Sequence, residues 1–174
     1  GKADGRIKTL MCPKAPDMTM PEVYEECKEF ALEHDLRMTT HLSQSQREYR
    51  QVKNLFGKTP PQHLYELGIM NDRLSGAHLN YATSDDTMLI QKTGMAILNC
   101  HSVESPLVDW IDLGIPIGLG TDDYFHNMND LLREQRNGQS VRGNKIGGYL
   151  GMINSSRKTT RPSFYKMLEL STIG

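Results

Sequence analysis

Short apolar runs alternate with amphipathic segments along this chain, and the alternation predicts strands and helices in turn. The last of these runs has the length and the Gly and Pro boundaries of a buried strand. The runs lie at residues 7–13, 37–42, 74–81, 96–100 and 114–120. Strands that alternate with helices in this way form parallel sheets. The pattern therefore predicts an α/β fold with parallel strands.

Helix signals stand between these runs. Thr19 and Pro21 are typical of a helix start, and the helix that follows is expected to pack inward through Val23, Cys27, Phe30, Ala31 and His34. Further helices are expected from residues 59, 83 and 105, with His63 in solvent and the Asp85-Asp86 pair serving only the helix dipole. Residues 43–49 form a polar connection after the second strand.

The last third of the chain is less regular. We expect a loop at 124–128, a helix at 130–136, a loop-rich segment at 137–161 and a last helix at 162–171. A closed barrel of alternating strands and helices needs eight strands and about 250 residues. Because the chain has 174 residues, we expect part of a longer polypeptide or an open half-barrel with two exposed strand edges.

The composition narrows the class of partner. A net charge of −1 argues against nucleic acid or an anionic membrane as the main partner. No apolar run approaches the roughly 20 residues that span a bilayer, and the N-terminus shows no secretion signal. The three cysteines, Cys12, Cys27 and Cys100, lack metal-type spacing. They fit small buried side chains in a reducing cytoplasm. We therefore expect a cytoplasmic protein with a small-molecule partner.

Three polar side chains follow predicted strands directly. Asp122 comes after the last apolar run, and His41 and His78 stand at the ends of two earlier ones. In barrels of this architecture, residues just past the carboxyl ends of strands face the active site. Two imidazoles and a carboxylate suit zinc or iron, and a bound metal lowers the pKa of water to about 7. The sequence therefore predicts a metal-centred hydrolytic site.

Four short motifs at successive strand ends carry a resemblance to a known family. They are Thr40-His41-Leu42, Gly76-Ala77-His78, Asn99-Cys100-His101-Ser102 and Gly120-Thr121-Asp122. In their order and spacing the chain resembles the amidohydrolase superfamily, in the branch of cytosine, guanine and adenosylhomocysteine deaminases and triazine hydrolases. The resemblance runs from the family's fourth barrel strand to the helix after its eighth. It implies that residues 1–174 are the C-terminal portion of a (β/α)8 TIM-type barrel.

The same resemblance implies roles for individual residues. His41 and Asp122 would bind one divalent metal, zinc or iron, and Asp122 would also accept a proton from the bound water. His78 would lie beside the metal and polarise the substrate or hold the attacking water. The substrate pocket would be lined by His101, Asp123, Tyr124 and His126.

Two departures from the family pattern affect this expectation. The family's His-x-His pair on its first barrel strand is absent, which leaves two protein ligands where catalytic zinc sites commonly have three. We therefore expect the isolated chain to bind metal weakly and to turn over nothing measurable. Gln44 stands where many of these deaminases have a glutamate that shuttles protons, and an amide cannot act as an acid or base near neutral pH. Glu48 could take that role if residues 44–49 are helical; a surface glutamate is the alternative.

The leading hypothesis is a metal-dependent hydrolase that acts on a C–N bond of a heterocyclic or amide-like small molecule, with metal-activated water as the nucleophile. A hydrolytic dehalogenase or urea-type hydrolase of the same family is one alternative. A non-catalytic half-barrel remnant or binding module is another. Pairing of half-barrels into a homo-oligomer also stays open.

Overall fold

The structure, a computed structural model, describes residues 3–100, 106–120, 122 and 169 of the chain. Within these residues, five parallel strands form one sheet in the order β1-β2-β3-β4-β5. The strands are β1 (Leu10–Met11), β2 (Arg37–Leu42), β3 (Leu74–His78), β4 (Ala96–Asn99) and β5 (Ile117–Leu119). The predicted α/β class with a parallel sheet is confirmed.

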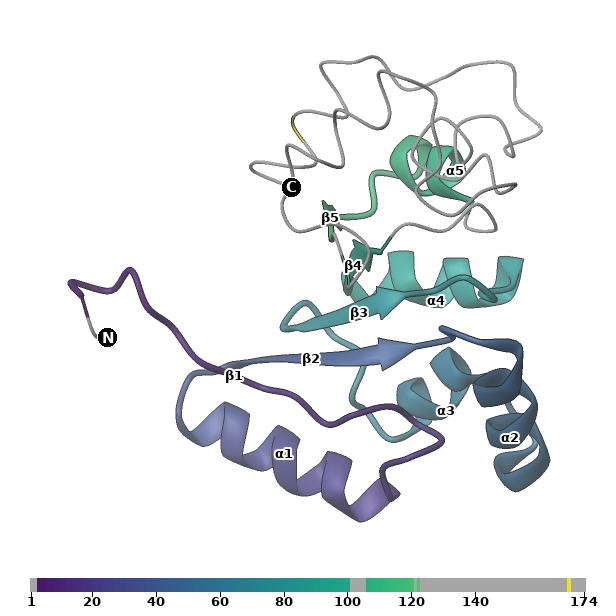
Figure 1. Cartoon of the computed structure of the whole chain (residues 1–174), viewed down its shortest axis with the longest axis horizontal. Helices are drawn as coiled ribbons and strands as arrows, with labels where there is room; N and C mark the ends of the chain where they lie inside the picture. Colours follow the sequence, from purple (N-terminus) through teal and green to yellow (C-terminus); the bar gives the residue numbers. More distant parts are fainter. Residues whose placement is uncertain (1–2, 101–105, 121, 123–168, 170–174) are drawn as a thin grey trace.

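Helices connect the successive strands. They are α1 (Pro21–Glu33), α2 (Gln46–Phe56), α3 (Pro60–Glu66), α4 (Ser84–Thr93) and α5 (Leu107–Asp112). In Figure 1 the strands lie side by side, and α2 lies beyond the carboxyl end of β2. Because every strand points the same way, all five carboxyl ends lie at one edge of the sheet. The helices predicted at 130–136 and 162–171, and the segments between them, lie outside the described residues.

One hydrophobic core joins the sheet to its helices. Its fully buried members include Leu42 of β2, Leu64 of α3, Ile90 of α4 and Ile97 of β4. Trp110 of α5 is also fully buried, and its indole N–H donates to the Thr87 hydroxyl over 3.2 Å. Such a bond satisfies the one polar group of an otherwise apolar side chain. The core therefore fixes α5 against α4 with the N–H of its one tryptophan paired.

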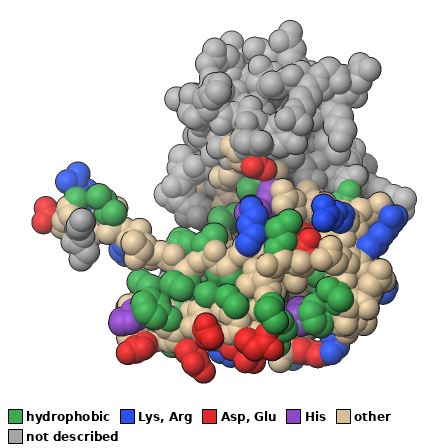
Figure 2. All heavy atoms as spheres, turned by 60° about the horizontal axis from the view of Figure 1, so that its bottom comes forward, with side chains coloured by type: hydrophobic (Ala, Val, Ile, Leu, Met, Phe, Trp, Pro, Cys, Tyr) green, Lys and Arg blue, Asp and Glu red, His purple; other side chains and the backbone are tan. Residues whose placement is uncertain are grey.

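Helix α1 packs through a face that overlaps the predicted one only in part, because Ala31 is buried and Cys27 is partly buried against the core as expected. Tyr24 and Ala31 are buried, whereas Val23 is 43% and Phe30 47% exposed. The Tyr24 hydroxyl lies 2.8 Å from the Thr40 hydroxyl of β2, and this buried hydrogen bond turns the Tyr24 side of the helix inward. Figure 2 shows hydrophobic side chains exposed on this side of the molecule, with acidic side chains along its lower edge.

Helix α2 occupies much of the stretch in which the sequence predicted only a polar connection. Its apolar content is low, and Val52 and Glu48 are its buried residues. The start signal was nevertheless present, because Ser45 caps the helix and accepts a hydrogen bond from the Glu48 amide. Serine followed three residues later by glutamate is the sequence signature of a capping box. Helix α4 begins with such a box, formed by Thr83 and Asp86.

The outermost strand is shorter than predicted. β1 spans two residues instead of the expected 7–13, and β3 ends at His78 instead of continuing to residue 81. After β3 the backbone takes positive φ values at His78 and Leu79, so it leaves the extended conformation there. None of the helices in the described part of the chain is long and apolar enough to cross a membrane.

His63 is buried, which corrects the expectation that it lies in solvent. Its side chain on α3 is 6% exposed and stacks on Phe56 of α2, with ring centroids 3.9 Å apart. Its Nε2 has no hydrogen-bond partner among the described residues. Burial, aided by the Lys58 ammonium, lowers the pKa of His63. The neutral imidazole is therefore the form that the α2–α3 contact favours.

This burial makes stability depend on pH. A histidine with a lowered pKa binds fewer protons in the folded than in the unfolded state. Its contribution to the free energy of unfolding is complete above about pH 6.5 and is lost as the pH falls towards the folded pKa. In His63→Phe, which keeps the ring stack, the difference in stability between pH 7.5 and pH 5.5 should shrink. Urea unfolding at the two pH values measures it, and an unchanged difference would contradict the assignment.

Candidate metal centre

His41 and His78 stand at the carboxyl ends of neighbouring strands. The register of the β2–β3 pair sets His41 opposite Ala77 and Leu42 opposite His78. The two imidazole rings are stacked, with centroids 5.3 Å apart and planes 17° from parallel. Asp122 follows β5, and its Oδ2 lies 3.9 Å from Nδ1 of His78. The structure therefore brings together the three side chains that the sequence placed at strand ends.

The ring of His41 is oriented by the segment that follows β1. Its Nδ1 lies 2.9 Å from the carbonyl oxygen of Lys14, and its backbone N–H donates to the same oxygen over 3.1 Å. A carbonyl can only accept, so Nδ1 carries the proton and Nε2 keeps a free lone pair. Metal-binding histidines ordinarily have one ring nitrogen held by such an outer partner. His41 is thus preorganised to bind a cation through Nε2.

His78 is enclosed, with a residue exposure of 3%. Burial lowers its pKa, the Asp122 carboxylate opposes that shift, and His41 and Lys14 act with burial. The net direction is downward, so His78 is a neutral imidazole at pH 7. A neutral ring has one N–H donor and one acceptor nitrogen. It can therefore hold a substrate atom or a water molecule by either kind of hydrogen bond.

Left-handed backbone conformations gather around these side chains. His78, Leu79 and Asp122 have φ values of +80°, +56° and +51°, and Ser43 has +49°. Such conformations cost non-glycine residues about 1–3 kcal/mol each and are concentrated at functional sites. Positive φ values also occur at Ala3, Asp4 and Asp35, the last of which lies just before β2, so such conformations are not confined to this edge of the sheet.

Gln44 and Glu48 differ in their relation to this edge. Gln44 is exposed, and its carbonyl accepts from the Asn80 side chain over 3.0 Å. Glu48 is buried, so the alternative of a surface glutamate is wrong. Its catalytic role required residues 44–49 to be helical, and the helix begins only at Gln46. Both carboxylate oxygens, however, accept backbone N–H groups over 2.7 Å. The side chain thus has no open oxygen with which to exchange protons with a substrate.

Four predicted pocket residues, His101, Asp123, Tyr124 and His126, lie outside the described residues. Their roles stay predictions. The sequence reasoning missed Lys14, whose carbonyl orients His41. Its position one residue after Pro13, at the end of the first apolar run, was the available signal, because every strand of this sheet ends at the same edge.

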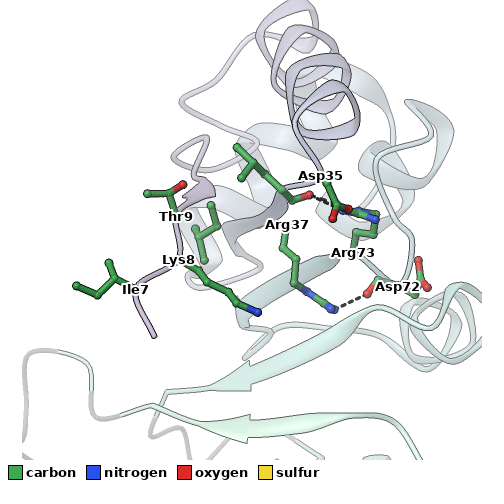
Figure 3. Close-up of a pocket in the computed structure, with 9 residues that line it drawn as sticks. Ile7, Lys8, Thr9, Asp35, Arg37, Asp72 and Arg73 are labelled. Atoms are coloured by element: carbon green, nitrogen blue, oxygen red, sulfur yellow. Dashed lines mark hydrogen bonds and ion pairs between the residues drawn. The ribbon is translucent and has the colours of Figure 1, made fainter. Parts of the chain in front are cut away.

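A pocket of about 850 Å³ lies at the other end of the strands. Its walls come from residues 7–10 before and within β1, from the turn before β2 and from the turn before β3. Figure 3 shows its two arginines paired with neighbours: Arg73 contacts Asp35 over 2.5 Å, and Arg37 donates to the Asp72 carbonyl over 2.6 Å. The amino ends of barrel strands serve stability rather than catalysis. We therefore assign the chemistry to the opposite edge, where the histidines lie.

Comparison with known families agrees with this site. A family model described as the amidohydrolase family matches residues 1–174. The chain belongs to the amidohydrolase family. Among the curated proteins that the chain resembles are several named 5-methylthioadenosine/S-adenosylhomocysteine deaminase. The protein of that name from Desulforamulus reducens is 28% identical over 99% of this chain and 40% of its own length. The one from Halothermothrix orenii is 29% identical over 98% of this chain and 40% of its own length.

Solved structures of amidohydrolases share this fold. One is an adenosine deaminase from Xanthomonas campestris with bound zinc. The match covers 98% of this chain and 38% of the deaminase chain, with a TM-score of 0.82 and 17% identity. Another is a mutant of atrazine chlorohydrolase from Arthrobacter aurescens, complexed with zinc and atraton. The match covers 97% of this chain and 37% of the chlorohydrolase chain, with a TM-score of 0.76 and 20% identity. The predicted part of a TIM-type (β/α)8 barrel is confirmed. This amidohydrolase chain spans about two fifths of the length of its curated relatives.

The candidate ligand side chains of the amidohydrolase chain are of types that bind zinc. His41 offers an imidazole nitrogen and Asp122 a carboxylate, both of which zinc accepts. Across residues 3–100, 106–120, 122 and 169, no group of three or more His, Cys, Asp or Glu side chains could hold a metal ion. The expected weak binding by the isolated chain stays a prediction.

Cys100 packs behind the site and limits what residue 120 can be. Burial raises the pKa of its thiol to about 11, and the Asp122 carboxylate adds to the shift. The thiol is therefore protonated and unreactive at neutral pH. A Cβ atom on Gly120 would stand 2.9 Å from Cys100 Sγ, closer than real Cβ contacts come. Glycine at 120 lets β5 pass close to β4 just before Asp122.

The close approach predicts a coupled pair of substitutions. Gly120→Ala should lower the free energy of unfolding by about 1–3 kcal/mol, the usual cost of overpacking. In a Cys100→Ala background the same change should cost clearly less, because the sulfur has been removed. A double-mutant cycle by urea unfolding measures the coupling. Equal costs in the two backgrounds would show that Sγ is not the obstacle.

Proposed function

We propose that the polypeptide containing this chain is a metal-dependent hydrolase that cleaves a C–N bond in a heterocyclic or amide-like small molecule and releases ammonia or an amine. The observation that carries the proposal is the convergence of His41, His78 and Asp122 at one edge of the sheet in an amidohydrolase chain. The names of the curated relatives, which are deaminases, support the choice of a C–N bond. Because the chain spans only part of their length, the activity belongs to the whole polypeptide.

One divalent metal, zinc or alternatively iron, would be held by Nε2 of His41 and by the carboxylate of Asp122. The neighbours solved with zinc support this choice. When bound, such an ion lowers the pKa of a coordinated water to about 7 and polarises the bond to be cleaved. The Lys14 carbonyl keeps His41 in the tautomer that can bind.

The other residues act on protons and on substrate position. Asp122 is close enough to His78 for one proton to be shared between them through a small adjustment, so it is the group that accepts a proton from the nucleophilic water. Neutral His78 holds the water or polarises the substrate. Gln44 holds the substrate through amide hydrogen bonds, and His101, Asp123 and His126 complete the pocket.

We further propose that residues 1–174 form the C-terminal portion of the barrel domain. The order of strands and the share of the relatives that is matched support this placement. Cys12, Cys27 and Cys100 are all free thiols, which supports a cytoplasmic location. We also propose that the polypeptide assembles into a homo-oligomer, which a measurement of its mass in solution tests.

Asp122→Asn tests the site directly. The amide keeps the size of the side chain but cannot accept a proton near neutral pH, so kcat/KM of the whole polypeptide should fall by about 10²–10⁴-fold. Asp85→Asn, at an exposed position in the first turn of α4, serves as the control and should keep its activity. Unchanged activity in Asp122→Asn would refute the assignment. A wild-type polypeptide that binds no zinc in calorimetric titration would favour the non-catalytic remnant.

Gln44→Glu tests whether residue 44 contacts the part of the substrate that receives or loses a proton. A carboxyl group at this exposed position can take up a proton and, in its protonated form, donate it to a leaving nitrogen, which the amide cannot. The variant should therefore gain an acid-dependent limb in its pH–rate profile and turn over heterocyclic amines faster than wild type. Gln46→Glu, exposed in the first turn of α2, adds the same charge away from the pocket. If both variants keep the wild-type profile, Gln44 does not contact the reacting part of the substrate.

Preference for halogenated or urea-type substrates over amines would support the alternative hydrolases.

A further inference from the structure

The turn between β2 and α2 has every backbone polar group at its centre paired. The N–H groups of Ser43 and Gln44 donate to Oε1 and Oε2 of Glu48, each over 2.7 Å. Ser43 has a φ of +49°, a conformation that needs support from its surroundings. Two consecutive N–H groups that point to one place form an anion-binding concavity. Glu48 fills this one with its own carboxylate.

The carbonyl groups of the same turn face the segment that follows β3. The Leu42 oxygen accepts from the Leu79 N–H over 2.9 Å, and the Ser43 oxygen accepts from the Tyr81 N–H over 3.1 Å. The Gln44 oxygen accepts from Nδ2 of Asn80 over 3.0 Å. Each donor lies within three residues of His78. The turn that Glu48 holds is therefore joined by three hydrogen bonds to the segment that begins at His78.

Glu48 does more than an ordinary capping residue at its position. It is the third residue of α2, as Asp86 is of α4, and both are buried acids. Asp86 accepts from the N–H of its own N-cap, Thr83, over 2.8 Å. Glu48 also has a backbone hydrogen bond from its own N-cap, Ser45. In addition it bonds the two residues before Ser45, and so reaches out of the helix into the turn after His41. Its carboxylate acts on the strand ends, whereas that of Asp86 acts on its own helix and on Thr59.

We propose that Glu48 is a positioning residue that sets the placement of His41 relative to His78 by clamping the turn between them. It contacts neither ring. It fixes the backbone two residues after His41, and that backbone in turn fixes the backbone just after His78. The consequence for metal binding rests on the proposed function above, whereas the consequence for the geometry of the two rings does not.

Glu48→Gln breaks the clamp with little change in size. An amide has one oxygen, so one of the two N–H groups would face another donor and lose its partner. Asp86→Asn makes the matched change in the α4 box, where Asp86 likewise accepts from a backbone N–H. Asn80→Ala removes one bond on the other side of the turn and leaves the buried carboxylate in place. All three variants are made in the whole natural polypeptide.

Two measurements distinguish a clamp from a helix cap. The first is the ring NMR signals of His41 and His78 in metal-free protein, and the second is zinc affinity by titration. Glu48→Gln should shift both histidines' ring signals and weaken zinc binding about tenfold or more, as losses of outer partners do. Asn80→Ala should shift the same signals less, and it decides the question if Glu48→Gln does not fold. Asp86→Asn should lower thermal stability and leave both readouts at wild-type values.

Ring signals that stay unchanged in Glu48→Gln, or in Asn80→Ala where that variant decides, would overturn the proposal and leave Glu48 as a helix cap. So would equal shifts in Glu48→Gln and Asp86→Asn. A wild-type protein that binds no zinc would end the proposed function, and the ring signals would still decide the role of Glu48.

Discussion

The parallel pairing of β2 with β3 is the constraint on which the site depends. One register sets Leu42 opposite His78, and the same register places His41 beside it at the edge of the sheet. In a strand, a slip by one residue would send every side chain to the other face. Because successive side chains of a strand point to opposite faces, this register alone would separate the two rings, since it pairs His41 with Ala77 and not with His78. The φ of +80° at His78 takes its backbone out of the extended conformation, and the two rings stack there. β5, two strands further along the sheet, brings Asp122 to the same edge.

Residues next to the strand ends make contacts that support this arrangement. The Tyr24 hydroxyl meets Thr40, the residue before His41, in a buried hydrogen bond of 2.8 Å. Burial raises the pKa of Tyr24 well above its ordinary value, so the phenol stays neutral and the bond persists. The Lys14 carbonyl orients the His41 ring, and Gly120 lets Cys100 fill the space beneath Asp122. The contacts of Thr40 and His41 each join a residue near the end of β2 to another part of the chain, so neighbouring elements support the site.

The sequence predicted the parts of this arrangement that depend on pattern. Apolar runs located all five strands, and the polar residue just after each run located His41, His78 and Asp122. The sequence did not reveal the contacts between these elements. The inward face of α1 is decided by one hydroxyl pair, Tyr24 with Thr40, that no periodicity reveals. Helix α2 was missed because its face towards the protein is held by the carboxylate of Glu48 and by Val52, and not by an apolar stripe.

The central claim is that His41 and Asp122 hold one divalent cation with His78 beside it. Anomalous X-ray scattering at the zinc edge, from crystals of the whole polypeptide grown with zinc, tests this most directly. The account predicts one strong peak about 2.0–2.1 Å from Nε2 of His41 and about 2.0–2.2 Å from a carboxylate oxygen of Asp122. Zinc bound elsewhere, or absent from this edge of the sheet in a protein that binds it in solution, would contradict the claim.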